Sequence, residues 1–578
     1  MKILGLHTNF HDASVSLHID NELIADYKED RFSRNKHDLK LEKALEKIQE
    51  DFNFSYADED VTLVSPSHYW HVQRNFGSSG FWYEQNKITD IIEETGKTVY
   101  QYDHEFAHAC AAYFSSGFFD HKTLIVSLDG LGLVRPFDTI NPENYRNPYF
   151  FDERTKNLAV YSAYRNKIEE IYTLQAASRN FHSQNLTDSY GAFLADLYLV
   201  VTSQLGFEPN SEEGKVLGLS VKGSYNSEIY TILNKVNWSY NNLNYNMDQA
   251  HFYLRMIEKY CELKKINENE ALRADLAYNT QLVFENCFLR FLNDIKNRFP
   301  GHTKLCLVGG CFSNVKLNQK INELTSFEEV WVYPAMGDEG VAHGSAIAHL
   351  YLTGHNIENK RINNMFYGAG YKQDYMDIFI TNDLKVEKLN PEKIAKKISR
   401  GYIIGVFQGR SEVGPRALGN RSILADPRTR RNHEMLNNKL QRNDIMPFAP
   451  IIMAEHISEL CYAYKSIATS EFMTMCYTVK DFWVNKIQAA LAPEDNSCRP
   501  KTVFKEKHPL IYSILSEFKK ITQVPALINT SFNAHGDPII NHPEHAIDYL
   551  NRGIIDYLIL GDKFISKHQE QEINQDRK

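Results

Sequence analysis

Short apolar runs that end in glycine-containing turns recur along this chain, with helical stretches between them. Four runs have the length and composition of buried strands: residues 3–6, 124–128, 305–308 and 402–407. Apolar side chains at helical spacing mark three other segments: residues 41–52, 271–298 and 548–552. The segment 271–298 contains no proline and predicts one long helix. Strands that alternate with helices predict an α/β fold. No internal repeat is detected in the sequence.

The 578 residues suffice for two to four domains of ordinary size. A polar stretch at residues 355–360 and a helix start at Asn390-Pro391 favour a domain boundary between them. We therefore expect an N-terminal domain of residues 1–360 and a C-terminal domain of residues 385–568. The final segment, 569–578, is charged and lacks aromatic residues, which predicts a disordered tail.

The charge balance restricts the class of partner. Lysine and arginine total 64 against 73 aspartate and glutamate, a net charge of −9, and no block of five like charges occurs. This balance argues against a nucleic acid or a membrane surface and favours a small-molecule partner, and a homodimer is compatible with it. No apolar run approaches the ~18 residues of a membrane span, and His7 and Asn9 interrupt the start before a signal-peptide core. The eight cysteines contain no C-x-x-C pair, so we expect no disulfide framework and a cytoplasmic location.

Two histidines four residues apart, His104 and His108, form the strongest metal-binding signal. Residues at this spacing share one face of a helix, and the composition of residues 106–113 favours a helix. Such a pair alone is more often incidental than ligating. Two carboxylates supply further ligands, because Asp129 follows the strand at 124–128 and Asp338 lies in the glycine turn 337–340. The four residues together predict a site for Fe(II), Mn(II) or Zn(II) that acts as a Lewis acid.

Glycine-containing turns at strand ends occur in four places: residues 5–7, 129–132, 309–310 and 337–340. Glycine lets backbone N–H groups approach a phosphate closely. The sequence contains neither Gly-x-x-x-x-Gly-Lys-Ser/Thr nor Gly-x-Gly-x-x-Gly, the motifs of P-loop and Rossmann proteins. The turns therefore favour the split-domain ATPase architecture of actin and the sugar kinases.

In order along the chain, eight sequence blocks resemble the O-carbamoyltransferases of the nodulation and antibiotic-tailoring type: residues 5–14, 104–108, 127–130, 213–219, 309–315, 337–340, 414–422 and 529–533. The resemblance covers essentially the whole chain, and the block Gly-Pro-Arg-Ala-Leu-Gly-Asn-Arg-Ser at 414–422 is highly specific. It implies an actin-like/sugar-kinase-like (ASKHA) split domain, related to the tRNA threonylcarbamoyl transferases, followed by a YrdC-like α/β twisted-sheet domain.

The resemblance also implies a two-step reaction with ATP and carbamoyl phosphate as co-substrates. The C-terminal domain would form carbamoyl-adenylate, and the N-terminal domain would transfer the carbamoyl group to an acceptor hydroxyl. The four metal ligands match the family's positions, with Fe(II) as the expected ion. His11 and Asp12 lie in the first turn, near the expected acceptor hydroxyl, and are the candidate catalytic residues. We expect His11 to be the general base, because an imidazole with a pKa near neutrality can take the hydroxyl proton. A purely structural His11, bonded to backbone in its turn, is the alternative.

The resemblance assigns binding residues to both nucleotide sites. The expected adenylate-binding residues of the N-terminal domain are Gly130, Lys215, Gly309, Gly310, Ser313 and Asn314. Those expected to bind ATP and carbamoyl phosphate in the C-terminal domain are Arg416, Arg421, Arg442, Arg499, Asn529, Ser531 and Asn533. Planar guanidinium groups suit polyphosphates, and the short polar residues follow the strand at 526–528, on a turn where they can grip phosphate or ribose.

One departure and one open question remain. Met446 stands where many members have arginine, so a phosphate contact is absent there and Arg442 or Lys439 would have to compensate. The acceptor is not specified, although the aromatic stretch 70–82 is a candidate acceptor wall or, equally, a satellite core. Two other functions compete with O-carbamoyl transfer. These are a tRNA threonylcarbamoyl-type transferase, which the charge disfavours, and a non-catalytic actin-like nucleotide-binding protein.

Overall fold

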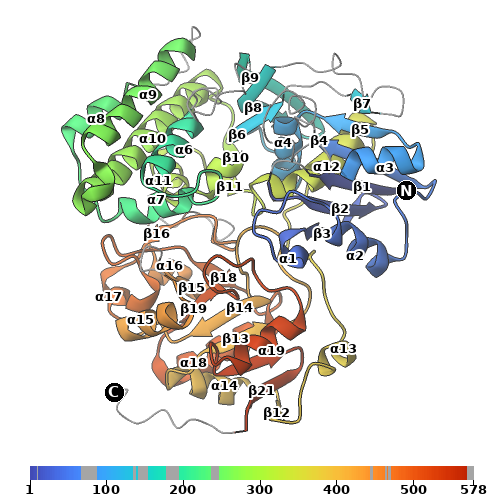
Figure 1. Ribbon diagram of the computed structural model, residues 1–578, viewed down its shortest axis with the longest axis vertical. Helices are drawn as coiled ribbons and strands as arrows, with labels where there is room; N and C mark the ends of the chain where they lie inside the picture. Colours follow the sequence, from blue (N-terminus) through green and yellow to red (C-terminus); the bar gives the residue numbers. More distant parts are fainter. Residues whose placement is uncertain are drawn as a thin grey trace. The chain divides into compact units, whose positions relative to one another are not determined.

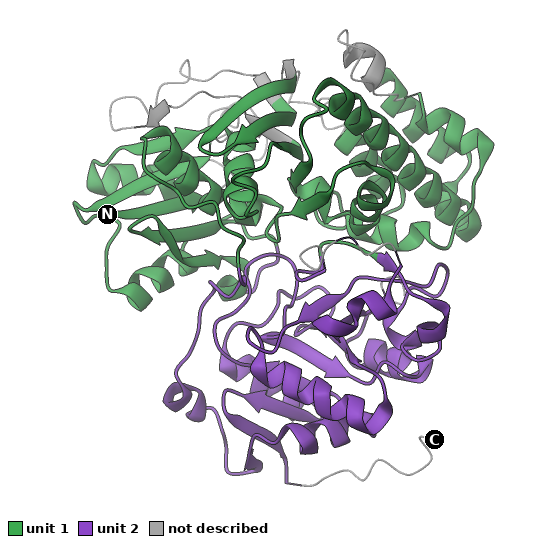
Figure 2. Cartoon of the chain, turned by 180° about the vertical axis from the view of Figure 1, so that it is seen from behind, with its two compact units in different colours: residues 1–33, 37–362, 474–476 green, residues 34–36, 363–473, 477–578 purple. Residues whose placement is uncertain are grey.

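The computed structural model describes residues 1–8, 11–66, 87–133, 138–140, 154–177, 194–235, 247–442, 447–462, 465 and 470–568. The chain divides into two compact units, coloured separately in Figure 2. Unit 1 comprises residues 1–33, 37–362 and 474–476, and unit 2 comprises residues 34–36, 363–473 and 477–578. The predicted disordered tail lies outside the described residues.

Unit 1 begins with a six-stranded sheet in the order β3-β2-β1-β4-β5-β7 (Figure 1). Its strands are β1 (Lys2–His7), β2 (Ser14–Ile19), β3 (Glu22–Lys28), β4 (Val61–Pro66), β5 (Val99–Tyr102) and β7 (Asp138–Ile140). The first three strands form an antiparallel meander, whereas β4 runs parallel to β1 and β5 parallel to β4. The connecting helices are α2 (Lys43–Phe52) and α3 (Lys87–Thr95), and α4 (His104–Phe114) follows β5.

The second sheet of unit 1 repeats this plan in the order β9-β8-β6-β10-β11. Its strands are β6 (Thr123–Leu133), β8 (Arg154–Tyr164), β9 (Lys167–Ala177), β10 (Lys304–Val308) and β11 (Glu329–Val332). Again the first three strands are an antiparallel meander and the next two are parallel to the first. The helices α10 (Glu270–Arg298), α11 (Val315–Leu324) and α12 (Val341–Leu352) take the places of α2, α3 and α4. This duplicated arrangement confirms the predicted actin-like and sugar-kinase-like fold.

The final helix of each repeat packs on the sheet of the other repeat. Helix α4 contacts β6, β8 and β10, and α12 contacts β1, β2, β4 and β5. The two helices also pack on each other, so closely that a Cβ atom built on Gly344 would lie 2.2 Å from the carbonyl oxygen of Ala107. Only glycine fits at this crossing. The crossing therefore fixes the N-terminal ends of α4 and α12 beside each other.

A helical segment separates β9 from β10. It contains α6 (Leu194–Gln204), α7 (Glu213–Ser220), α8 (Ser227–Leu233), α9 (Met247–Leu263) and the long helix α10. The last of these confirms the helix predicted from residue 271 to 298. The side chain of Asn269 caps it by accepting a hydrogen bond from the backbone N–H of Leu272 at 3.1 Å.

Unit 2 contains an eight-stranded mixed sheet in the order β12-β21-β20-β13-β14-β19-β15-β18. Its strands are β12 (Leu384–Lys388), β13 (Ile404–Phe407), β14 (Arg421–Ala425), β15 (Ala449–Met453), β18 (Lys501–Val503), β19 (Ala526–Ser531), β20 (Tyr557–Leu560) and β21 (Lys563–Lys567). Four of its helices are α14 (Pro391–Ser399), α15 (Arg430–Lys439), α18 (Pro509–Thr522) and α19 (Pro543–Asn551). Helices α14 and α18 pack together. Since each unit combines sheets with helices, both belong to the predicted α/β class.

Among the described residues, no helix is both long and apolar enough to cross a membrane. All eight cysteines are free thiols, and all but the half-buried Cys311 are buried.

Candidate metal centre and catalytic site

The first two turns of α4 bring the two predicted histidines close together. Asp103 caps the helix by accepting a hydrogen bond from the N–H of Phe106 at 2.8 Å, so that His104 is the first helical residue and His108 follows one turn later. Both side chains are buried, and their ring centroids lie 4.8 Å apart. The helix predicted from residue 106 to 113 is therefore present and extends one residue or more beyond both ends.

The two predicted carboxylates meet these histidines from the second repeat. Asp338 opens a short 3-10 turn, Asp338–Gly340, immediately before α12. Asp129 lies within β6 rather than after it, because the strand continues to Leu133 through a bulge, which corrects the predicted strand end. The His108 Nε2 to Asp129 Oδ2 distance is 3.1 Å, and the His104 Nε2 to Asp338 Oδ1 distance is 3.3 Å. One ligand atom from each of the four residues lies within 4.8 Å of the other three.

The chemistry of this cluster fits a divalent cation. His104 Nε2 and Asp338 Oδ1 are buried and lie 3.3 Å apart, but among the described residues neither makes a well-aligned hydrogen bond. Burial would lower the pKa of both imidazoles, but the neighbouring carboxylates outweigh it, raising the pKa of His108 to about 9 and that of His104 well above its usual range. A cation would satisfy the two orphaned atoms and take the place of the imidazole protons. Two imidazole nitrogens with two carboxylate oxygens suit a borderline ion such as Fe(II), Mn(II) or Zn(II).

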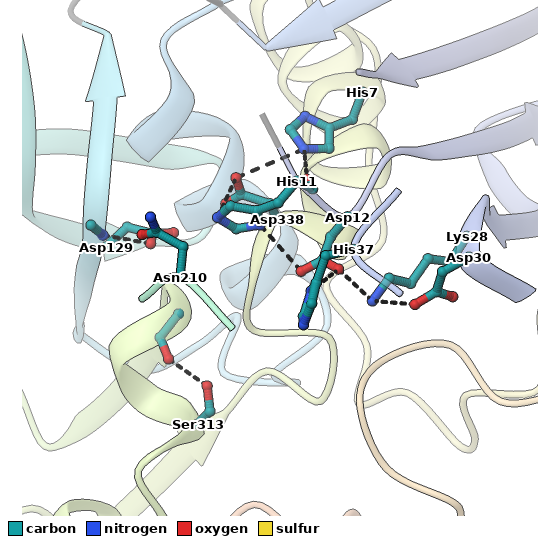
Figure 3. A network of polar contacts seen from close by, with 12 residues as sticks. His7, His11, Asp12, Lys28, Asp30, His37, Asp129, Asn210, Ser313 and Asp338 are labelled. Atoms are coloured by element: carbon teal, nitrogen blue, oxygen red, sulfur yellow. Dashed lines mark hydrogen bonds and ion pairs between the residues drawn. The ribbon is translucent and has the colours of Figure 1, made fainter. Parts of the chain in front are cut away.

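His11 and Asp12 form a dyad next to this cluster. His11 Nδ1 lies 3.2 Å from Asp12 Oδ2, and His11 Nε2 lies 3.9 Å from Asp338 Oδ2 (Figure 3). Burial lowers the pKa of His11, but the Asp338 carboxylate, with help from Asp12, raises it to about 9. Asp12 adopts a left-handed backbone conformation, with φ of 60°, of the kind that is often found at functional sites. The structure thus places both predicted catalytic residues beside the candidate metal ligands.

Four polar residues around the dyad were not predicted. Asp12 Oδ1 lies 2.7 Å from His37 Nδ1 and 2.7 Å from Lys28 Nζ, and Lys28 also pairs with Asp30 at 3.1 Å. Figure 3 shows Asp12 between His11 and Lys28. These cationic and hydrogen-bonding partners hold the pKa of the Asp12 carboxyl well below its usual range despite burial. The dyad therefore rests on a carboxylate that is fixed from three sides.

The fourth unpredicted residue, His7, ends β1, the first strand of the first repeat. Its Nε2 lies 3.8 Å from Asp338 Oδ2 and 3.1 Å from the carbonyl oxygen of His11. Burial lowers the pKa of His7 to about 4, so its ring is neutral. Asp129 lies on β6, the first strand of the second repeat. No local sequence pattern marks His7 as a site residue, because Asp338, its neighbour in the structure, is far away in the sequence.

Glycine residues line the cluster on the side of β10. Gly309 has φ of 102°, and a Cβ atom there would lie 2.3 Å from the carbonyl oxygen of Leu128. A Cβ atom on Gly310 would lie 3.1 Å from Asp129 Oδ1. The predicted cradle at Gly309 and Gly310 is thus next to a metal ligand. The hydroxyl of Ser313 donates to the carbonyl oxygen of Gly310.

The other predicted adenylate residues have partners within the protein. Asn314 caps α11 by accepting a hydrogen bond from the N–H of Leu317 at 3.0 Å. The N–H of Gly130 donates to Asp129 Oδ1 at 2.6 Å. Lys215 lies on α7, where it pairs with Glu212 and its ammonium lies 5.5 Å from the ring centroid of Phe207. Adenylate binding by these residues stays a prediction.

In unit 2, Arg442 gathers part of the predicted triphosphate site. Its guanidinium donates to Thr530 Oγ1 at 2.7 Å, to Ser531 Oγ at 3.0 Å and to Asn533 Oδ1 at 2.8 Å. Asn529 is buried, and its side chain donates to the carbonyl oxygen of Ala417 at 2.9 Å. Asn529 and Ser531 lie on β19, which runs to Ser531, so the turn predicted after residue 528 begins later.

The specific block at 414–422 is organised by two buried charges. Glu412 Oε1 accepts hydrogen bonds from the N–H groups of Leu418, Asn420 and Arg421 at 2.7, 2.8 and 3.1 Å. The Arg421 guanidinium lies 3.7 Å from the centroid of the Phe407 ring and donates to four backbone carbonyl oxygens, those of Gln408, Asn420, Ala369 and Gly409. These contacts give Arg421 a structural part, and its predicted contact with ligand stays a prediction. Arg416 and Arg499 are half-buried, in the turn before β14 and between two short strands, β17 (Ser497–Cys498) and β18. Met446 and the aromatic stretch 70–82 lie outside the described residues.

Comparison with known proteins gives two family matches. Residues 70–347 match the family model of the carbamoyltransferase N-terminus, and residues 395–567 match that of the carbamoyltransferase C-terminus. An uncharacterized protein of Methanocaldococcus jannaschii is 32% identical over 480 residues, which is 79% of this chain and 72% of the relative. Nodulation protein NolO of Bradyrhizobium diazoefficiens is 32% identical over 280 residues, 46% of this chain and 50% of the relative. Among solved structures, T. kodakarensis HypF matches with a TM-score of 0.32 and 15% identity over 62% of this chain and 49% of HypF.

Proposed function

Because the chain belongs to the carbamoyltransferase family, and is therefore an enzyme of carbamoyl transfer, we propose that it is an ATP-dependent O-carbamoyltransferase acting on a small hydroxylated acceptor. In the C-terminal unit, water would cleave carbamoyl phosphate to carbamate and phosphate. A carbamate oxygen would then bond to the α-phosphorus of ATP, the bond from that phosphorus to the β-phosphate oxygen would break, and carbamoyl-adenylate and pyrophosphate would result. In the N-terminal unit, the acceptor oxygen would bond to the carbamoyl carbon, the bond from that carbon to the phosphate oxygen would break, and AMP would leave. The net charge of −9 favours a sugar or another small molecule over a nucleic acid as acceptor, and eight free cysteines suit the cytoplasm.

The observation that carries the proposal is the convergence of His104, His108, Asp129 and Asp338 next to the His11–Asp12 dyad. These four residues would hold a divalent metal, with Fe(II) as the expected ion. When bound, the ion would supply Lewis-acid polarisation of an oxygen of the adenylate. The adjacent Gly309 and Gly310 have no side chains, which lets the backbone of this turn lie directly against Leu128 and Asp129.

The dyad would move the acceptor proton. A hydrogen bond from Nδ1–H of His11 to Asp12 fixes the tautomer in which Nε2 accepts a proton. Nε2 is on the side of Asp338, where the acceptor hydroxyl would meet the adenylate. The negative charge of Asp338 is the main reason for the raised pKa of His11, and neutralising it with a cation favours the neutral ring that a general base requires.

In unit 2, Arg442 would bind phosphate. Its guanidinium is already oriented by Thr530, Ser531 and Asn533, so little side-chain freedom is lost when a ligand binds. A planar group with several N–H donors suits bidentate phosphate binding.

The test separates the two half-reactions. Purified protein is given ATP and carbamoyl phosphate, pyrophosphate release is measured, and a panel of hydroxylated acceptors is screened for carbamoylated product. His108→Ala is expected to abolish product while pyrophosphate release continues, and Arg442→Met is expected to reduce pyrophosphate release by at least tenfold. Pyrophosphate release that does not depend on carbamoyl phosphate, or transfer to tRNA but to no small acceptor, would contradict the proposal.

A further inference from the structure

Two adjacent residues of β8, Lys156 and Asn157, contact the two elements that carry three of the four candidate metal ligands. Both side chains are buried, with 3% and 0% of their surfaces exposed. Burying a lysine and an asparagine side by side costs free energy unless each is paired. The contacts that pair them lead to α4 in one case and to the Asp129 bulge in the other.

Asn157 faces the bulge that contains Asp129. In the register of β6 with β8, Leu128 pairs with Leu158 and the next pair is Gly132 with Lys156. Three residues of β6, 129–131, therefore stand opposite Asn157 alone. The register of β8 with β9 also skips Asn157, since Lys156 pairs with Gln175 and Leu158 with Leu174. Bulges of this kind re-aim a side chain out of the regular alternation of a strand.

The side-chain amide of Asn157 replaces the missing ladder contact. Its Nδ2 donates to the carbonyl oxygen of Gly130. The N–H of the same glycine donates to Asp129 Oδ1 at 2.6 Å. The amide thus holds the C-terminal side of Gly130, and the N–H on the other side of the same residue contacts the Asp129 carboxylate.

Lys156 acts on the start of α4. Its Nζ lies 3.2 and 3.3 Å from the two carboxylate oxygens of Asp103, pairs with Glu170 and lies 3.4 Å from the hydroxyl of Tyr161. Asp103 is the cap of α4, and its Oδ1 accepts the N–H of Phe106. The ammonium forms an ion pair with this half-buried capping carboxylate, and His104 is the next residue along the chain.

We propose that Lys156 and Asn157 are positioning residues of the metal centre, with Lys156 setting the first turn of α4 and Asn157 setting the Asp129 bulge. The proposal rests on the proposed metal site and adds residues that contact no ligand. Partners of this indirect kind typically change metal affinity by about 10- to 100-fold when they are removed.

The test measures metal affinity without recourse to catalysis. Metal-free full-length protein is titrated with Fe(II) under anaerobic conditions, and with Zn(II) as a redox-inert probe, in competition with a chromogenic chelator. Asn157→Leu, of similar volume but without a donor, and Lys156→Met are each expected to weaken binding by about 10-fold or more. Thermal unfolding of the metal-free proteins reports on folding.

Matched controls remove the same chemistry elsewhere in unit 1. Asn279→Leu deletes a fully buried amide of α10, and Lys304→Met deletes a lysine that pairs with Glu328 and Glu329 at the start of β10. Both controls should bind metal as the wild type does. If Lys156→Met fails to fold, Asn157→Leu decides the question. Wild-type affinity in Asn157→Leu would overturn the positioning inference alone, whereas a wild-type protein that binds neither ion would overturn the metal site and the inference together.

Discussion

Replacing Gly344 by alanine is expected to disrupt the candidate metal centre, although Gly344 is not one of its ligands. The added Cβ atom would lie 2.2 Å from the carbonyl oxygen of Ala107 and 2.7 Å from its carbonyl carbon. Both obstacles are helix backbone, so no side chain can rotate away. Relief to ordinary van der Waals contact requires α4 and α12 to separate by about 1 Å.

That displacement is large on the scale of metal coordination. Helix α4 carries His104 and His108, and Asp338 directly precedes α12, so the separation acts between ligands. Metal–ligand distances tolerate deviations of about 0.2 Å. We therefore expect Gly344→Ala to weaken metal binding by about 100-fold or more, and overpacking to cost about 1–3 kcal/mol of stability.

The assay is the same chelator competition, together with thermal unfolding of the metal-free protein. Gly301→Ala is the control, because a Cβ atom there would meet only the side chain of Lys122, at 3.9 Å. A Gly344→Ala protein with wild-type metal affinity would show that the helix crossing does not hold the ligands together, and the argument from close packing would be wrong.

Two further predictions concern lysines, Lys28 in unit 1 and Lys501 in unit 2. Lys28→Met removes the cation beside Asp12, so we expect kcat for carbamoyl transfer to fall about 10-fold with little change in the acceptor KM. Lys28→Arg should recover most of this loss. An unchanged kcat in Lys28→Met would show that Lys28 does not support the dyad. Lys501 is buried in unit 2, and this burial lowers its pKa from 10.5 to about 8. Between these two pH values the side chain is protonated in the unfolded chain and neutral in the folded protein, so the free energy of unfolding rises with pH. Lys501→Met should accordingly be more stable than wild type at pH 7, by up to about 3 kcal/mol, with the difference in unfolding temperature shrinking as the pH approaches 10.5; a difference that is constant with pH would refute the assignment.

Local patterns in the sequence were sufficient for the ligands of the candidate site. An i, i+4 spacing on a helix brings His104 and His108 to one face whatever the rest of the fold. Asp129 and Asp338 were recognisable because each follows a strand-like apolar run and adjoins glycine. The position of Asp129 inside a bulged strand was not recognisable, since a bulge depends on the register with β8.

The residues that support the site carry no such pattern. Lys28, His37, Lys156 and Asn157 are single polar residues whose partners lie far away in the sequence, apart from the neighbouring Asp30 and Tyr161. The duplication of unit 1 was not recognisable in the sequence either. Strand order is conserved between the repeats while the chemistry has diverged, as His7 on β1 and Asp129 on β6 illustrate. The two repeats share a fold without a detectable repeat in the amino-acid sequence.

The exchange of final helices between the two repeats has a thermodynamic consequence. His104 and His108 come from one repeat and Asp129 and Asp338 from the other, so an ion held by all four spans the seam. An ion that binds more tightly to the docked halves than to the separated halves stabilises the docked state by the same free energy. Loss of such an ion would then weaken the docking of the two halves of unit 1, and a partner that separates the halves would release the ion.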